Sequence, residues 1–233
     1  MHANHVSLGK ATVLVLLVLS LFCGPVAANQ ADAREVMTEW IAAQQETEAV
    51  EVSFVQDRRL RGLRKPMRST GTFWLVKSGN MRWQIGDPPK TIAIYTDETV
   101  TVIRPSKGEY KQRQLVATEE GSETERMFLQ TGLPTSLEQF EKFASVEGLT
   151  EVAVNPALTG VVLKLKDRKA ASAVDRLVLY IDQKRQMLAG YEIAFRDKSE
   201  VITQFSKIAK KASIPADTFT EDVSGLKQVE WKK

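Results

Sequence analysis

The chain has 233 residues, 43% of them hydrophobic, and carries a net charge of +3 at neutral pH. A balance this near neutral gives no global reason to expect binding to nucleic acid. The single cysteine excludes an internal disulfide framework, so the fold must depend on an ordinary hydrophobic core.

The first 28 residues have the pattern of a secretory signal peptide. Lys10 precedes an apolar run over residues 11–22, and small residues follow at positions 26–28. A run of about twelve residues is well short of the roughly twenty that a membrane-spanning helix needs. We therefore predict cleavage after Ala28, export through the inner membrane to the periplasm, and a single domain over residues 29–233.

Cys23 suggests the alternative of a lipid anchor, because it directly follows the apolar run. Lipoprotein processing requires a small residue immediately before the modified cysteine, and Phe22 occupies this position. The sequence therefore favours cleavage over lipidation.

This cleavage also removes His2, His5 and Cys23, so the exported chain has neither histidine nor cysteine. Without them it cannot form a Ser-His-Asp triad, a Cys-His pair or a histidine-ligated metal site. Paired carboxylates such as Asp175 and Glu192 leave a hydrolase as an alternative. Acidic residues at turns and on polar strand faces are usually solvated, so we predict a protein that is not an enzyme and uses no cofactor or metal.

The exported chain begins with a predicted helix over residues 33–48. Val36, Trp40 and Ala43 recur at spacings of four and three, and Asp32 is a suitable N-cap. Alternating apolar and polar residues then predict ten short strands, separated by turns rich in Gly, Asn, Asp and Pro. These strands lie near residues 50–56, 70–76, 81–85, 91–95, 99–104, 109–116, 161–166, 177–181, 191–195 and 201–205.

Two predicted helices interrupt the strands in the middle of the chain. The first covers residues 123–130 and is amphipathic, and the second covers residues 136–145. Thr135 and Glu138 have the spacing of a capping box at the start of the second helix. The apolar residues of the first helix, which we regard as a candidate lid, are Met127, Phe128 and Leu129.

This order of elements predicts a mainly β fold of the α+β type, with one strongly curved antiparallel sheet. Strand alternation assigns ten apolar residues to its concave face, where they either pack a dry core or contact an apolar ligand. These residues are Phe54, Phe73, Met81, Trp83, Ile92, Ile94, Leu163, Leu179, Ile193 and Phe195.

A basic segment follows the first predicted strand. Its six positive charges are Arg58, Arg59, Arg61, Arg64, Lys65 and Arg68. At the tip of a hairpin, such charges are either simply solvated or form a docking patch for anionic headgroups or for an acidic face of a membrane partner.

Several short motifs resemble those of one known family. Phe54-x-Gln56 is similar to an F-x-Q strand motif, residues 71–74 to G-x-[LF]-W, and Arg82-Trp83 to the R-W that follows. Near the end, Thr203-x-Phe205 and Ile214-Pro215 are similar to the closing strands of the same family. By the order and spacing of these motifs, the chain resembles LolA, the periplasmic lipoprotein carrier family, over most of its length after the signal peptide.

The resemblance implies an open half-barrel of eleven strands with a helical lid over its concave face. It also implies a carrier, which we expect to be a monomer, that takes acylated lipoproteins from an inner-membrane transporter to an outer-membrane acceptor. Two alternatives stay open: a LolA-like carrier of another envelope lipid or glycolipid, and an envelope-stress sensor that binds lipoproteins and reports to a partner protein.

The chain departs from the family pattern at two positions. Lys77 stands near the place of a family arginine that hydrogen-bonds lid carbonyls and holds the empty pocket closed. Lysine keeps the charge but loses the planar fork of donors, so the resemblance implies Lys77 as an altered latch. Met81 stands where phenylalanine is usual and still offers a soft apolar surface to an acyl chain. These differences leave room for a paralogue that carries a different lipid.

Overall fold

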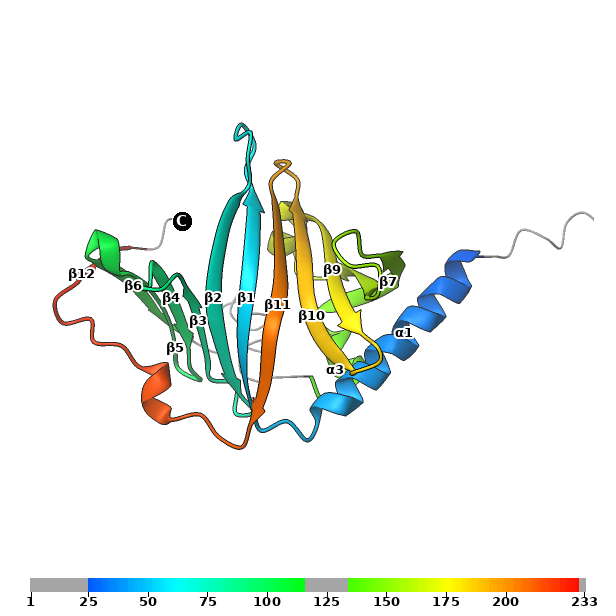
Figure 1. Ribbon diagram of the computed structural model, residues 1–233, viewed down its shortest axis with the longest axis horizontal. Helices are drawn as coiled ribbons and strands as arrows, with labels where there is room; N and C mark the ends of the chain where they lie inside the picture. The colour runs from blue at the N-terminus through cyan, green and yellow to red at the C-terminus, as the bar shows by residue number, and fades with distance from the viewer. Residues whose placement is uncertain (1–24, 116–133, 231–233) are drawn as a thin grey trace, which may run out of the picture.

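The computed structural model of the chain describes residues 25–115 and 134–230, which form one large sheet with few helices (Figure 1). The helices are α1 (Pro25–Gln44), α3 (Leu137–Phe140) and α4 (Arg168–Ala173), with short 3-10 helices η1 (Pro105–Lys107) and η2 (Ala216–Phe219). The strands are β1 (Ala49–Arg59), β2 (Met67–Val76), β3 (Met81–Ile85), β4 (Thr91–Tyr95), β5 (Thr99–Arg104), β6 (Glu109–Gln114), β7 (Ala144–Glu151), β8 (Thr159–Leu165), β9 (Val174–Asp182), β10 (Met187–Phe195), β11 (Glu200–Lys211) and β12 (Lys227–Gln228).

Within these residues the sheet has 12 strands in the order β12-β6-β5-β4-β3-β2-β1-β11-β10-β9-β8-β7. All neighbours are antiparallel except β12, which runs parallel to β6. Two meanders, β2 to β6 and β7 to β11, are therefore joined where β1 pairs with β11. Because β12 and β7 lie at opposite edges, the sheet is not closed into a barrel, which confirms the predicted open, mainly β fold.

The strong curvature of the sheet follows from one contact across it. The rings of Trp83 on β3 and Tyr191 on β10 have centroids 6.4 Å apart. Four strand spacings separate β3 from β10, or about 19 Å in a flat sheet. The sheet must bend for these rings to approach, so the face that carries Trp83 and Tyr191 is the concave face.

Helix α1 packs on the concave face over β7, β8 and β9, and lies at this end of the sheet (Figure 1). Its predicted apolar stripe is buried there: Val36, Met37, Trp40 and Ile41 pack against Leu163 and other residues of β7 to β9. Asn29 and Gln30 at the start of the predicted mature chain bond the backbone of β7, with Gln30 Nε2 2.7 Å from the Val146 carbonyl oxygen. Side-chain bonds thus hold α1 to an edge strand.

The C-terminal segment covers part of the opposite, convex face. Ile214, Phe219, Val223 and Leu226 pack against apolar residues of β2, β4, β5 and β6. Arg82 on β3 fastens this segment: its guanidinium donates to the carbonyl oxygens of Thr218 and Thr220 and lies 2.8 Å from a carboxylate oxygen of Glu221. The sheet is therefore covered on both faces, by different ends of the chain.

Several predicted boundaries are wrong. Helix α1 begins at Pro25, so Asp32 lies inside it and is not its N-cap. The helix predicted over residues 136–145 stops at Phe140, and Ser136 caps it by accepting a hydrogen bond from the Gln139 amide. The residues that follow form β7, which pairs with β8 as an edge strand.

The sequence pattern predicts neither α4 nor β12. Among the described residues, no helix combines the length and the apolar character needed to cross a bilayer.

Candidate functional site

Five aromatic side chains meet on the concave face, one from each of five neighbouring strands. We call Phe54, Phe73, Trp83, Tyr191 and Phe205 the aromatic cluster. The Trp83 ring stacks on Phe54, with centroids 4.1 Å apart, and lies 5.5 Å from Phe73. Tyr191 continues the cluster to Phe205 at 6.4 Å, edge to face. Only Phe54 is fully buried, and the other four rings are half-buried.

The strand register brings these rings together. Phe54 lies directly across from Gly71 on β2 and from Phe205 on β11. A Cβ atom at Gly71 would stand 2.4 Å from the Phe54 ring and 2.2 Å from the Gln84 carbonyl oxygen. Because Gly71 has no side chain, the Phe54 ring can occupy the space beside it, and Trp83 stacks on that ring. The pairing explains why a glycine stands at the position of the G-x-F-W strand that faces Phe54 of the F-x-Q strand.

A polar row borders the cluster. Gln56, Thr203 and Tyr191 are successive cross-strand neighbours on β1, β11 and β10. The Gln56 amide donates to the Thr203 hydroxyl at 3.0 Å, and Thr203 is fully buried. The pKa of the Tyr191 phenol lies above its ordinary value because the group is buried. Hydrogen bonds with Thr203 and Gln56 offset part of this rise. The row thus places satisfied polar groups beside an apolar surface.

Seven of the ten predicted concave residues have side chains on that face, in two separate groups. Phe54, Phe73, Met81, Trp83 and Ile193 lie on the part that α1 does not cover. Leu163 and Leu179 lie beneath α1 as part of its packed core. Phe195 follows an irregularity in the pairing of β10 with β9 and is half-buried, so the register does not assign it to the concave face.

The assignment of Ile92 and Ile94 to the concave face is wrong. Trp83 pairs with Ala93, so the two isoleucines on either side of Ala93 point to the convex face. There they are buried with Phe219 beneath the C-terminal segment.

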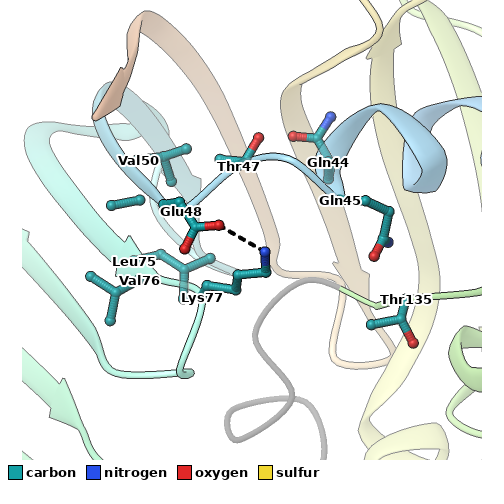
Figure 2. A pocket seen from close by; sticks show the side chains of 10 residues that line it. Gln44, Gln45, Thr47, Glu48, Val50, Leu75, Val76, Lys77 and Thr135 are labelled. Atoms are coloured by element: carbon teal, nitrogen blue, oxygen red, sulfur yellow. Dashed lines mark hydrogen bonds and ion pairs between the residues drawn. The ribbon is translucent and has the colours of Figure 1, made fainter. Parts of the chain in front are cut away.

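A small cavity lies at the end of the concave face, near the connection between α1 and β1 (Figure 2). Its volume is about 110 Å³, and its lining includes the cross-strand neighbours Val50 and Leu75. Leu75 also pairs with Met81, so the cavity continues the apolar row that leads from the aromatic cluster. The hydroxyl of Thr47 in its wall is buried and has no hydrogen-bond partner among the described residues.

Lys77 lies at the rim of this cavity and is exposed. Its ammonium group is 2.8 Å from a carboxylate oxygen of Glu48, as Figure 2 shows. Its backbone amide donates to the Glu48 carbonyl oxygen. Lys77 thus joins β2 to the start of β1. The lid residues Met127, Phe128 and Leu129 lie outside the described residues, so the latch role of Lys77 stays a prediction.

The six basic residues lie on the hairpin between β1 and β2, and every one of them is exposed. Arg59 forms an ion pair of 2.8 Å with Glu200, and Arg68 one of 3.6 Å with Asp57. The hairpin also carries the exposed apolar side chains of Leu63 and Met67, which strand alternation did not single out.

Asp175 and Glu192 are bound to different partners. Glu192 accepts a hydrogen bond of 2.8 Å from the Tyr180 hydroxyl, and Asp175 lies 3.9 Å from Arg196. Within residues 25–115 and 134–230, no group of three histidine, cysteine or acidic side chains is arranged so that it could hold a metal ion.

Sequence reasoning missed Tyr191 and Phe205. The alternation that selected Ile193 also places Tyr191 on the same face of β10. Phe205 stands opposite Phe54, a relation that appears only when β1 and β11, far apart in sequence, are known to pair.

Several solved structures are similar to this chain at low sequence identity. An uncharacterized conserved protein from Thermus thermophilus has a TM-score of 0.50 and 7% identity, covering 86% of this chain and 99% of that chain. A LolA superfamily protein from Nitrosomonas europaea has a TM-score of 0.42 and 10% identity, covering 81% and 97%. The Mycobacterium tuberculosis lipoprotein LppX has a TM-score of 0.40 and 11% identity, covering 79% and 99%.

No curated protein sequence matches the chain. The family model described as outer membrane lipoprotein carrier protein LolA matches residues 45–222, which include the strands that carry the aromatic cluster. This match extends over most of the chain and confirms the resemblance drawn from the motifs, and the protein is therefore a member of the LolA family.

Proposed function

We propose that the protein is a periplasmic carrier that binds the acyl chains of lipoproteins on its concave face and moves them from the inner to the outer membrane. The observation that carries this proposal is the aromatic cluster. Its rings come from the five strands in the middle of the sheet, and α1 buries the neighbouring part of the concave face instead. A half-buried apolar surface inside a curved sheet is suited to hold hydrocarbon.

The energetics agree with such a ligand. Each methylene removed from water contributes about 0.8 kcal/mol, so a surface that covers ten methylenes contributes about 8 kcal/mol before the cost of ordering the chain. The aromatic cluster and Met81, which lies in line with it, offer aromatic and thioether groups to such a chain. The role is therefore binding and transfer rather than covalent chemistry.

The cavity beside the cluster indicates that groups around it must move. Its volume of about 110 Å³ is below the roughly 300–1,000 Å³ of ordinary ligand pockets. Uptake of an acyl chain therefore requires displacement of side chains or of covering chain segments. The buried, unpartnered hydroxyl of Thr47 would then be available to a polar group near the end of the chain.

Membership of the LolA family supports the same proposal, because its model is described as that of an outer membrane lipoprotein carrier. The periplasmic location, the inner-membrane donor and the outer-membrane acceptor belong to the proposal on this basis.

Native mass spectrometry tests the proposal. The protein is expressed with its own signal region, isolated from the periplasm of its native host without detergent, and its bound lipids are identified after gentle release. Triacylated peptides at near-stoichiometric amounts would support the proposal. A non-peptidic envelope lipid would replace the substrate but keep the carrier role, and a reproducibly lipid-free protein would refute it.

A further inference from the structure

The hairpin between β1 and β2 projects beyond the sheet, at the end where the turn between β10 and β11 also lies (Figure 1). Its tip, residues 58–68, carries two large apolar side chains in water. Leu63 is 50% exposed and Met67 is 53% exposed. Among the described residues the only comparable side chain is Val154, at 42%. Exposed apolar side chains gathered at one protruding point favour contact with another surface.

Positive charge surrounds these two side chains. Arg61, Arg64 and Lys65 are exposed, and none of them has a carboxylate within ion-pair distance in the part of the chain that the structure describes. Arg59 does pair with Glu200, which ties the base of the tip to β11. Arg59 therefore ties the base of the tip to the sheet. Hydrogen bonds from Ser199 do most to lower the pKa of the Asp197 carboxyl, in the turn between β10 and β11, and Arg61 lies close enough to lower it further. Arg64 and Lys65 are the neighbours of Leu63 in the chain.

We propose that this tip, residues 58–68, docks the protein on the surface of an anionic lipid bilayer. Leu63 and Met67 enter the interface, and the neighbouring guanidinium and ammonium groups contact lipid phosphates. A bilayer satisfies both features at once, since its headgroups are anionic and its acyl boundary is apolar. The proposal concerns the outer surface and goes beyond the proposed function, because docking does not depend on which ligand the concave face holds.

The shape of the tip favours a membrane over an acidic protein face. An acidic surface would match the charges but would leave Leu63 and Met67 without an apolar partner unless it also held a pocket for each. Two apolar side chains on a narrow projection instead suit a soft surface that closes around them.

Vesicle flotation tests the proposal with the purified full-length mature protein. The parent protein should bind vesicles of phosphatidylethanolamine and phosphatidylglycerol, bind phosphatidylcholine vesicles much more weakly, and dissociate as salt rises. Arg61→Gln/Arg64→Gln/Lys65→Gln should weaken the partition coefficient by roughly a hundredfold, because each basic residue near an anionic surface contributes about a factor of five.

The apolar pair is tested separately. Leu63→Ser/Met67→Ser should weaken partitioning by roughly tenfold. Matched controls away from the tip are Val154→Ser for the apolar change and Lys164→Gln/Lys166→Gln/Lys207→Gln for the charge, and both should bind like the parent. Leu63→Trp should show a blue-shifted emission on anionic vesicles, because the indole leaves water.

Absence of binding to anionic vesicles would overturn the proposal. So would a loss of binding in the charge variant alone, with no effect of the serine changes and no blue shift, since that pattern indicates electrostatic adsorption in which Leu63 and Met67 do not enter the bilayer. Lipid analysis of the same preparations is a separate readout, so failure of docking and failure of acyl binding can be told apart.

Discussion

Replacing Met81 with glutamate tests directly whether the concave face binds hydrocarbon. The Met81 side chain is half-buried on that face, between its cross-strand neighbours Leu75 and Tyr95. An acyl chain lying along this row would lose contact worth about three methylenes, or about 2.4 kcal/mol. Covering an ionised carboxylate adds at least about 2 kcal/mol. The sum of about 4 kcal/mol corresponds to roughly a thousandfold weaker binding.

The assay is titration of the purified protein with a fluorescent fatty acid, with circular dichroism and urea unfolding measured on the same samples. Met81→Leu keeps the volume and apolar character and should bind within a factor of about three of the parent. Thr70→Glu places the same charge on the exposed convex side of β2 and should leave binding unchanged. If Met81→Glu binds as tightly as Thr70→Glu, the row through Met81 does not contact the ligand and the reasoning fails.

Three further predictions concern the framework of the site. Gly71→Ala should lower the free energy of unfolding in urea by at least about 2 kcal/mol, because its Cβ meets the Gln84 carbonyl oxygen at 2.2 Å; Gly225→Ala, whose Cβ meets nothing within 4 Å, should be neutral. Arg82→Met should lower the free energy of unfolding by about 2 kcal/mol and expose the C-terminal segment to limited proteolysis. The change removes two hydrogen bonds to carbonyl oxygens and an ion pair at a side chain that is only 11% exposed. Unchanged proteolysis would contradict the role of Arg82 in holding this segment. Burial and the hydrogen bond to a carboxylate raise the pKa of Tyr180 above the ordinary value of 10.0, so the folded state resists deprotonation and loses stability as pH rises above about 10. Tyr180→Phe should flatten that alkaline loss in a pH series of urea unfolding, and an unaltered slope would show that other groups cause it.

The sequence predicted the strands well where one face of each strand is apolar. Residues 81–85, 99–104 and 191–195 alternate or nearly so, and each forms a strand there. Alternation divides side chains between two faces, but it does not say which face is concave. In β4 the residues Ile92 and Ile94 stand out as the apolar set, and the C-terminal segment gives them a core on the convex side. Only the pairing of Ala93 with Trp83 reveals this.

Strand β7 was not predicted from the sequence, for a related reason. Its pairing with β8 shifts between Val146 and Gly148, so the period of two breaks inside the strand. Phe140, Phe143 and Ala144 before the shift have apolar spacing typical of a helix, which extended the predicted helix too far. Tertiary pairing with β8 outweighs that local pattern.

The paired motif Arg82-Trp83 links the two faces of the sheet. Because neighbouring residues of a strand point to opposite sides, Trp83 builds the aromatic cluster on the concave face while Arg82 holds the C-terminal segment on the convex face. Gly71 on the adjacent strand completes the arrangement by leaving room for the Phe54 ring under Trp83. The same few residues thus line the concave face and hold the segment that covers the convex face. If the concave face binds hydrocarbon as proposed, we expect a substitution here to change stability and ligand binding together, whereas a substitution at Met81, which lies beside the cluster, should separate the two effects.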